Sequence, residues 1–567
     1  MKRVLTISLI WVLLCIVHGA YGQRHHRTLI VPVEFTDLHF STSQETLDSL
    51  AKALSRYYGS QFPDSTKFIF DVNGVVSAGN TVAYFGANAS HRRDAYSYKM
   101  AVGIFRSLSG RVDFSKYDYN SDGNINHIIF ITAGIGESGG GGDNQFWPQY
   151  VELNENEIPY GKPRLTAFAM APELGPDGKV AGIGMLAHEF GHVLGLKDMY
   201  DTDGQSSGGT YPGLGTSSLM DFGLENNGGH TPPYLNAIER EMLGAGRCET
   251  LDTCATISLE PIHLNGRYCK LPSSVENKYW LLENRKAEGN DAFIGGEGML
   301  IYKIDKSDNP AGISTYYQRT LSALERWQLN QVNCNPDYPG AGIVPAIADT
   351  AITPQVFWPQ EGRTVFSPGK LAITDIRREA GGNISFKVLE PLRIDGVSVF
   401  QSSAIIAWSV SDELGPVDSC KIEWFIQGNP VGSALGQAAD HGGYSYTISG
   451  LIPRTGYSYT ATVFYRDGSS FSNSGSFTTR IFRKGIFRFI YLGDAGRNAD
   501  GSFKPGTSIP LVVYNSVNEE VVWSFNGRQI SAGPDGLWEI PDSGTLRAEV
   551  STAEGSKEII EKEIVLR

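Results

Sequence analysis

The sequence predicts a multidomain protein in which an α/β (α+β) domain is followed by a β-rich extension and two all-β sandwich domains. Three observations predict this. About 545 residues follow the leader described below, too many for a single hydrophobic core. Apolar strands alternate with helical periodicities up to about residue 250, and short strands with turn signals fill the remainder.

The first residues have the pattern of a secretory signal peptide. A positive Met1-Lys2-Arg3 precedes an apolar run from Val4 to Val17, and the small residues Ala20 and Gly22 follow. This predicts export, with cleavage before Gln23; an uncleaved anchor or a lipid anchor is the alternative. No other stretch is apolar enough to span a membrane. The mature chain is therefore expected to be soluble and exported: secreted, on the cell surface or periplasmic.

Charge and cysteine usage exclude several classes of protein. The net charge is -13, and no basic cluster of the kind that binds nucleic acid is present. Five cysteines follow the leader, so at least one lacks a partner within the chain. Cys248 and Cys254 are close enough in sequence to close a small loop. No CxxC pair occurs, which argues against a thiolate zinc site.

The first part of the chain alternates between expected strands and helices. We expect, in order, a strand at 28–35, a helix at 47–58, short strands over 68–85 with turns at Gly74 and Gly79, a helix at 98–108, a strand at 127–133, a mobile Gly-rich loop at 134–142, and helices at 180–196 and 233–243. From Cys254 onward the pattern changes to alternating strands up to about Leu392.

The last two segments read as all-β. Residues 394–479 show regularly spaced strands, with Trp408 in one of them and Tyr457 in a setting that resembles the tyrosine corner of a fibronectin type III domain. Residues 481–567 contain Trp523 and an Asn526-Gly527 pair, which predicts a two-residue hairpin turn. This segment resembles an immunoglobulin-like sandwich.

The expected helix around residue 188 carries the motif HEFGHVLGLKD. His188 and His192 are four residues apart, so both imidazoles leave the same helix face and can share one metal ion. Glu189 lies beside them, where a carboxylate can take a proton from a water on the metal and later give it to a leaving amine. The alternative is a core helix with incidental histidines.

A catalytic zinc needs a third protein ligand and one open position. Gly195 comes three residues after His192 and permits the left-handed turn that ends a helix. The chain can then return and present Asp198. The segment therefore predicts one continuous three-ligand zinc site of the form HExxHxxGxxD.

A methionine follows in the segment GLGTSSLMDFG. Met220 fits the tight turn that forms the floor of the metal site in metzincins; an ordinary core methionine is the alternative. Phe222 stands where some metzincins have a tyrosine that stabilises the transition state. Tyr211 and His230 are weak candidates for that role.

Several blocks of the sequence resemble the immune inhibitor A family of secreted metallopeptidases. The resemblance rests on GIGMLAHEFGHVLGLKDMYD, on the methionine segment above, and on DFSKYDYNSDGNINHIIFITAG, YWLLENRKAEGNDAFIGGEGMLIYKID and LAITDIRREAGGNISF. It extends from about Leu29 to Val388. At Lys197 the chain departs from the family, which often has proline there.

The resemblance implies a zincin or metzincin-like catalytic domain and an endopeptidase that acts on proteins. It assigns His188, His192 and Asp198 as zinc ligands and Glu189 as the general base. We therefore expect five parts: a signal peptide at 1–22, a catalytic domain at 23–250, a β-rich subdomain at 251–390 that completes the peptidase unit, a fibronectin type III-like domain at 391–480 and an immunoglobulin-like sandwich at 481–567.

A second metal is predicted from an oxygen-rich loop. It has Gly123 at position six and oxygen donors at odd positions, the calcium-loop pattern, formed by Asp118, Asn120, Asp122, Asn124 and Asn126. Ile129 stands where a bidentate glutamate would be. A structural calcium is expected; an Asn/Gly turn without metal is the alternative. Asp201 and Asp203 after the zinc motif read more readily as a solvated turn than as a further calcium site.

Three functions compete. A secreted zinc endopeptidase with protein or peptide substrates is the main prediction, because the non-ligand Glu189 is present beside all three ligands. The alternative is a peptidase-like scaffold that acts as an adhesion or binding protein through its C-terminal β-domains. An exported hydrolase with a non-peptide substrate is the third. A cell-surface or glycan ligand is the expected partner of the β-domains, by analogy from fold.

Overall fold

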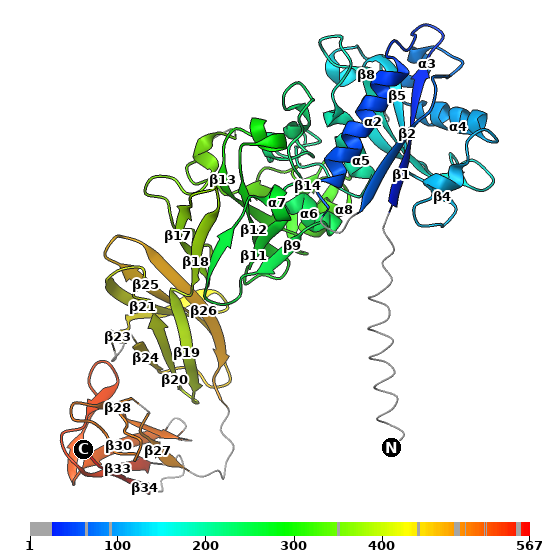
Figure 1. Cartoon of the computed structure of the whole chain (residues 1–567). Coiled ribbons are helices and arrows are strands. Elements are labelled where there is room, and N and C mark those ends of the chain that lie inside the picture. Colours follow the sequence, from blue (N-terminus) through cyan, green and yellow to red (C-terminus); the bar gives the residue numbers. More distant parts are fainter. Residues whose placement is uncertain are drawn as a thin grey trace, which may run out of the picture. The chain divides into compact units, whose positions relative to one another are not determined.

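The computed structural model describes residues 25–62, 66–89, 93–348, 352–438, 443–480, 488–493, 495–514, 516, 519–551 and 557–567 (Figure 1). The predicted signal peptide lies outside these residues. The chain divides into two compact units. The first holds residues up to Val365 together with Ile373–Val388, and the second holds Phe366–Ala372 together with Leu389–Arg567.

The first unit begins with a mixed sheet in the order β2-β1-β5-β8-β6, with β3 also paired to β1. Its strands are β1 (His25–Glu34), β2 (Lys67–Val72), β3 (Val76–Ser77), β5 (Ile128–Ile135), β6 (Gln149–Glu152) and β8 (Ala167–Leu174). β1, β2, β3, β5 and β8 run parallel, while β6 pairs antiparallel with β8 and ends the sheet. The apolar run expected as a strand is β5, which is buried on both faces as a central parallel strand should be.

Helices cover both faces of this sheet (Figure 1). α2 (Gln44–Gly59) and α5 (Ile183–Val193) pack on the face that includes Ile30 and Ile129. α4 (Ser97–Leu108) packs on the opposite face, with Leu29 and Phe130. Alternate residues of β1, β5 and β8 therefore belong to two separate cores. Both expected helices, 47–58 and 98–108, are confirmed.

Some boundaries differ from the expectation. Residues 82–86 form the short helix α3 (Val82–Gly86), not a strand, because the Thr81 side chain accepts the Tyr84 N–H and caps a helix there. Helix α6 (Ala237–Leu243) begins later than expected, since Asn236 and Glu239 form a capping box. All five cysteines after the leader are free, so Cys248 and Cys254 close no loop.

The β-rich segment that follows shares a core with the first sheet. Phe190 of α5, Leu281 and Leu300 belong to one buried cluster. Two sheets have the orders β16-β13-β12-β11-β9 and β10-β18-β17, beside the hairpin β14-β15. The elements are β9 (Arg247–Thr250), β10 (Ala255–Leu259), α7 (Ile262–Asn265), β11 (Arg267–Pro272), β12 (Lys278–Arg285), β13 (Gly298–Asp305), β14 (Pro310–Ser314), β15 (Arg319–Ser322), α8 (Ala323–Gln328), β16 (Ala341–Ile343), β17 (Ala372–Arg378) and β18 (Ile384–Leu389).

The second unit begins with a β-sandwich of two four-stranded sheets, β19-β20-β24-β23 and β22-β21-β25-β26. Trp408 is fully buried between them, and the Tyr457 hydroxyl accepts the Ile452 N–H at 2.9 Å, which is the tyrosine-corner contact. The strands are β19 (Leu392–Val399), β20 (Ser403–Val410), β21 (Val417–Ile426), β22 (Asn429–Leu435), β23 (Gln437–Ala438), β24 (Gly443–Ser449), β25 (Gly456–Tyr465) and β26 (Ser470–Thr478).

The last segment is also entirely β. Its strands are β27 (Phe489–Tyr491), β28 (Ser508–Pro510), β29 (Val512–Tyr514), β30 (Glu520–Phe525), β31 (Arg528–Ile530), β32 (Leu537–Glu539), β33 (Gly544–Ser551) and β34 (Lys557–Ile564). Asn526 and Gly527 join β30 to β31 with positive φ values of 47° and 78°, as a two-residue hairpin turn requires. Within the described ranges, no helix has both the length and the apolar character needed to cross a membrane.

Candidate metal centre

Helix α5 presents the predicted ligands. His188 and Glu189 are buried on it, and His192 lies one turn further along. The helix ends at Val193, and Gly195 adopts a φ of 103°, in the left-handed region that favours glycine. This turn lets the chain reverse, so Asp198 comes back beside both histidines, as the sequence predicted.

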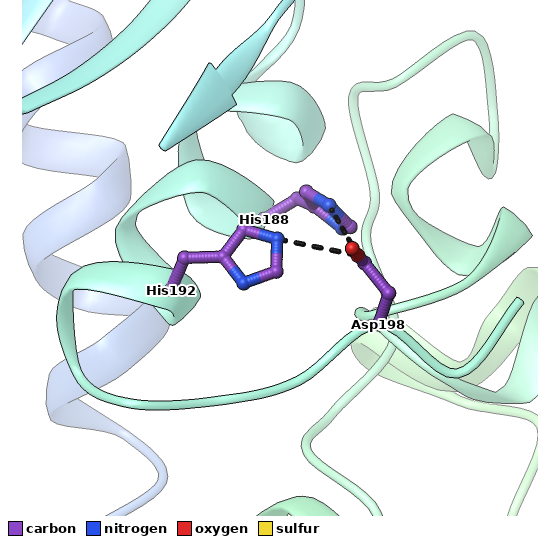
Figure 2. Close-up of side chains that lie close together, drawn as sticks. All are labelled: His188, His192 and Asp198. Atoms are coloured by element: carbon purple, nitrogen blue, oxygen red, sulfur yellow. Dashed lines mark ion pairs between the residues drawn. The ribbon is translucent and has the colours of Figure 1, made fainter. Parts of the chain in front are cut away.

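The three side chains meet at one point (Figure 2). The Nε2 atoms of His188 and His192 each lie 3.2 Å from the Asp198 Oδ1 atom. Their rings are perpendicular, with centroids 4.9 Å apart. Donors bound tetrahedrally to one zinc at about 2.0–2.1 Å are separated by about 3.3 Å. The observed spacing therefore matches a shared zinc ion.

The electrostatics of the cluster require a positive charge at this point. The His188 Nδ1 atom lies 3.0 Å from the Leu219 carbonyl oxygen, and the His192 Nδ1 atom lies 2.9 Å from that of Leu196. If each Nδ1 donates its proton there, each Nε2 lone pair faces a carboxylate oxygen. The Asp198 Oδ1 atom is buried and has no hydrogen-bond partner among the described residues. Only a cation, either a metal or added protons, makes such a convergence favourable.

The pKa values of His188, His192 and Asp198 also indicate a positive charge between these side chains. Burial opposes ionisation of Asp198, but the two histidines outweigh it and hold the pKa of this carboxyl well below its usual range. The pKa of each histidine is raised: burial lowers it, and the Asp198 carboxylate more than compensates. The residues thus fit a divalent cation.

Glu189 is buried and does not join the ligand cluster. Its Oε2 atom has no hydrogen-bond partner among the described residues. Burial raises the pKa of this carboxyl to about 8; the Asp198 charge adds to the rise and His188 opposes it. An unpaired carboxylate oxygen beside a metal site is available to exchange protons.

Met220 packs beneath the helix. A Cβ atom placed on Gly191 would lie only 2.8 Å from the Met220 Sδ atom, so the glycine is needed for this close approach. The Met220 carbonyl oxygen also accepts the Met199 N–H at 2.8 Å, which ties the turn to the residue after Asp198. Met220 thus packs against the helix that carries the two histidines, and its role as the floor of a metal site stays a prediction.

Tyr200 is a neighbour of the site that sequence reasoning missed. Its ring centroid lies 6.4 Å from that of His188. Burial and the negative charges of Asp198 and Glu189 raise its pKa, so the phenol stays protonated and can donate. Its position two residues after a metal ligand was the available signal. Among the described residues, Tyr211 and His230 form no hydrogen bond, ion pair or ring contact with the three proposed ligand side chains.

An apolar cavity of about 440 Å³ lies between the segment around the methionine turn and the β-rich segment. Its wall includes Gly213, where an added Cβ would come within 2.7 Å of the Met199 carbonyl oxygen, so the wall starts beside the residue after Asp198. The lining combines residues before and after the methionine turn with residues of the β-rich segment: Tyr211, Pro212, Gly213, Gly215, Thr216, Phe222, Ile343, Pro345, Ile352 and Val356.

The oxygen-rich loop uses many of its oxygens internally. Asp118 accepts the N–H groups of Asp122 and Gly123 at 3.1 and 2.8 Å. Asp122 accepts the Asn124 N–H at 2.8 Å and the Asn120 side-chain amide at 3.0 Å. Among the described residues, the Asn126 side chain forms no hydrogen bond. Calcium here stays a prediction.

Asp201 and Asp203 also form a hydrogen-bonded turn. Asp201 accepts the N–H groups of Asp203 and Gly204 at 3.1 and 3.0 Å. Donor atoms of Asp201, Asp203 and Cys334 lie within 4.8 Å of one another.

An HExxH helix whose two histidines approach an aspartate above a methionine turn is an arrangement typical of metal-dependent peptidases. Residues 20–241 match the family described as immune inhibitor A peptidase M6, catalytic domain.

Two curated relatives match part of the chain. The chain is 32% identical over 191 residues to immune inhibitor A of Bacillus thuringiensis subsp. alesti, covering 27% of this chain and 26% of the relative. It is 27% identical over 203 residues to the pre-pro-metalloprotease PrtV of Vibrio cholerae serotype O1, covering 31% and 22%. The matches thus span about a quarter of the length of these relatives.

Solved structures match the chain only distantly. The Ig1-2 module of the Drosophila receptor protein tyrosine phosphatase DLAR is 14% identical, with a TM-score of 0.15, over 31% of this chain and 99% of that one. A fibronectin type III domain derived from the human KIAA0970 protein is 14% identical, with a TM-score of 0.14, over 17% and 77%. TM-scores this low carry no weight for the fold.

Proposed function

We propose that this chain is an exported zinc-dependent endopeptidase that hydrolyses peptide bonds in proteins. The observation that carries the proposal is the convergence of two imidazole Nε2 atoms on one Asp198 oxygen, beside the unpaired and buried Glu189. The family of residues 20–241 supports it.

His188, His192 and Asp198 would hold the zinc, which when bound polarises a carbonyl group and a water molecule. The chain's own residues do the remaining work. Glu189 takes a proton from the attacking water at Oε2 and passes it to the leaving amine.

Strand β6 offers a place for the substrate chain. It ends the sheet and pairs only with β8 among the described strands, so its outer edge is open to another strand. The Tyr150 ring on this strand stacks 6.5 Å from the His192 ring, which brings the edge close to the ligands. An extended peptide can add to such an edge through its backbone.

The alternative function is a peptidase-like scaffold that binds a partner through the second unit. A scaffold has no use for an unpaired buried carboxylate beside its metal ligands, because burying such a group costs free energy. This observation favours catalysis.

The proposal also includes export, the five-part domain division and a cell-surface or glycan ligand for the β-domains.

The first prediction separates the base from the ligands. Glu189→Gln keeps the size of the side chain but cannot accept a proton, so we expect zinc to stay bound while turnover falls about 10²–10⁴-fold. His192→Ala removes a ligand, so both zinc and turnover should be lost. Hydrolysis of a fluorescent protein substrate and the zinc content of the mature chain measure these effects.

Two results would contradict the proposal. One is full activity of the Glu189→Gln variant; the other is activity of the parent chain that survives complete removal of zinc by a chelator. Cleavage of the protein substrate but not of small esters would separate an endopeptidase from a hydrolase with a non-peptide substrate.

The second prediction concerns Tyr200, which we propose donates a hydrogen bond to the oxyanion. Tyr200→Phe removes only the hydroxyl, so kcat should fall about 10²–10³-fold while zinc affinity is unchanged. Tyr160→Phe is the matched control, because that side chain is fully exposed. Equal effects of the two substitutions on kcat would rule out the assignment.

The third prediction concerns substrate choice. We propose that the apolar cavity receives a large apolar side chain beside the scissile bond. Ile343→Trp narrows the cavity, so kcat/KM for substrates with a large residue should fall roughly tenfold more than for substrates with a small one. Ile313→Trp, at an exposed position of β14, is the control. Cleavage mapping with a peptide library would show no apolar preference if the idea is wrong.

The fourth prediction tests calcium at the Asp118 loop, which we propose has a structural role. Added calcium should raise the melting temperature of the zinc-loaded chain, because a ligand that binds only the folded state stabilises it. Asp118→Asn should abolish the rise, and Asp177→Asn, in an exposed turn, should leave it intact. Calorimetry measures the shift; an unchanged rise in the Asp118 variant would exclude this loop.

A further inference from the structure

A distant asparagine holds the third ligand of the metal centre. The Asn330 Oδ1 atom accepts the Asp198 N–H at 2.7 Å, and the Asn330 Nδ2 atom donates to the Asp198 Oδ2 atom at 2.7 Å. One amide thus contacts the backbone and the side chain of the same aspartate, 132 positions away in the sequence. Two such bonds fix both the position of the aspartate and the plane of its carboxylate.

The two oxygens of Asp198 consequently have separate tasks. The amide of Asn330 occupies Oδ2, and Oδ1 is left facing both histidine Nε2 atoms at 3.2 Å. We propose that Asn330 is a positioning residue that presents Asp198 to the metal through one oxygen. The inference rests on the zinc site proposed above, and it extends that site into the β-rich segment.

Asn330 is itself held firmly. It follows helix α8, which starts with a capping box formed by Ser322 and Glu325. The Gln331 N–H donates to the Arg326 carbonyl oxygen at 2.8 Å, and Arg326 is fully buried with its Nε donating to the Ala311 carbonyl oxygen. The asparagine therefore sits on a rigid platform and not on a free loop.

The next residues repeat the connection. The Asn333 Nδ2 atom donates to the Met199 carbonyl oxygen at 2.7 Å, and its Oδ1 atom accepts the Ala341 N–H at 3.0 Å. Consecutive residues after the glycine turn, Asp198 and Met199, are thus both bound by the segment that follows α8. This segment lies well beyond residue 241, where the family match ends.

The backbone at Asn330 guides the choice of variant. Its φ is 55°, in the left-handed region that asparagine and glycine tolerate best. Asn330→Gly therefore removes both hydrogen bonds without straining the backbone. Asn330→Asp keeps the shape and the acceptor but places a second negative charge against Asp198 Oδ2. Gln328→Ala, at an exposed position of α8, is the control.

Zinc affinity of the full mature chain is the primary measurement, by competition with a chromophoric chelator and without substrate. We expect Asn330→Gly to weaken zinc binding about 10–100-fold, the usual effect of removing a partner that orients a ligand. Asn330→Asp should weaken it too, and Gln328→Ala should not. The visible spectrum of the cobalt-substituted chain should change in both Asn330 variants, because the ligand geometry changes.

A double-mutant cycle separates positioning from general stability. In an Asp198→Ala background, Asn330→Gly should cause no further loss of zinc affinity, because the group that it orients is absent. A full additional loss would overturn the proposal, as would wild-type zinc affinity and an unchanged cobalt spectrum in Asn330→Gly. Melting temperatures of the metal-free variants show whether each one folds.

The cycle also distinguishes this inference from the proposed function. If Asp198→Ala binds zinc as tightly as the parent chain, the assigned metal site is wrong, and the role of Asn330 falls with it. If Asp198→Ala loses zinc but Asn330→Gly does not, the metal site stands and only the positioning role is overturned.

Discussion

The carboxylate of Asp198 is a charge taken out of water, with only 5% of the residue exposed. Burying an unpaired carboxylate costs several kcal/mol, so every atom around it has to compensate. Two imidazoles face one oxygen and an asparagine amide holds the other. The glycine turn after α5, the carbonyl groups that orient the histidines and the platform behind Asn330 all follow from this one requirement.

The floor of the site depends on a second set of buried charges. Glu239, fully buried, accepts the Ser218 hydroxyl at 2.7 Å and the Met220 N–H at 3.1 Å. Beside it, Arg285 pairs with Glu283 at 2.9 Å and with Asp291 at 2.5 Å, and its Nη1 atom donates to the Ser217 carbonyl oxygen. Breaking such a buried pair costs about 3–5 kcal/mol. These bonds hold the methionine turn against α6 and β12. The β-rich segment therefore contacts the proposed metal site through the methionine turn as well as through Asn330.

The features that the sequence predicted are those determined by local spacing. His188 and His192 share a helix, Gly195 ends it, and the Asn526-Gly527 turn closes a hairpin between adjacent strands. Val82–Gly86 was wrong as a strand because five apolar residues fit either period, and only the Thr81 cap decides. The role of Asn330 could not be predicted from the sequence, because Asp198 is 132 positions away and no motif around Asn330 indicates a contact with a metal ligand. Tyr200 lies two residues after Asp198 in the sequence, but no motif marks it as part of the site.

The part of the chain that resembles known peptidases is therefore shorter than the part that contributes residues to the proposed site. The family match ends at residue 241, and it includes the proposed ligands, the proposed base and the methionine turn. The segment beyond it supplies Asn330 and the cavity walls at Ile343, Ile352 and Val356. On the proposed function, the extension positions Asp198 and lines the proposed substrate cavity, and a fragment that ended at residue 241 would lack both.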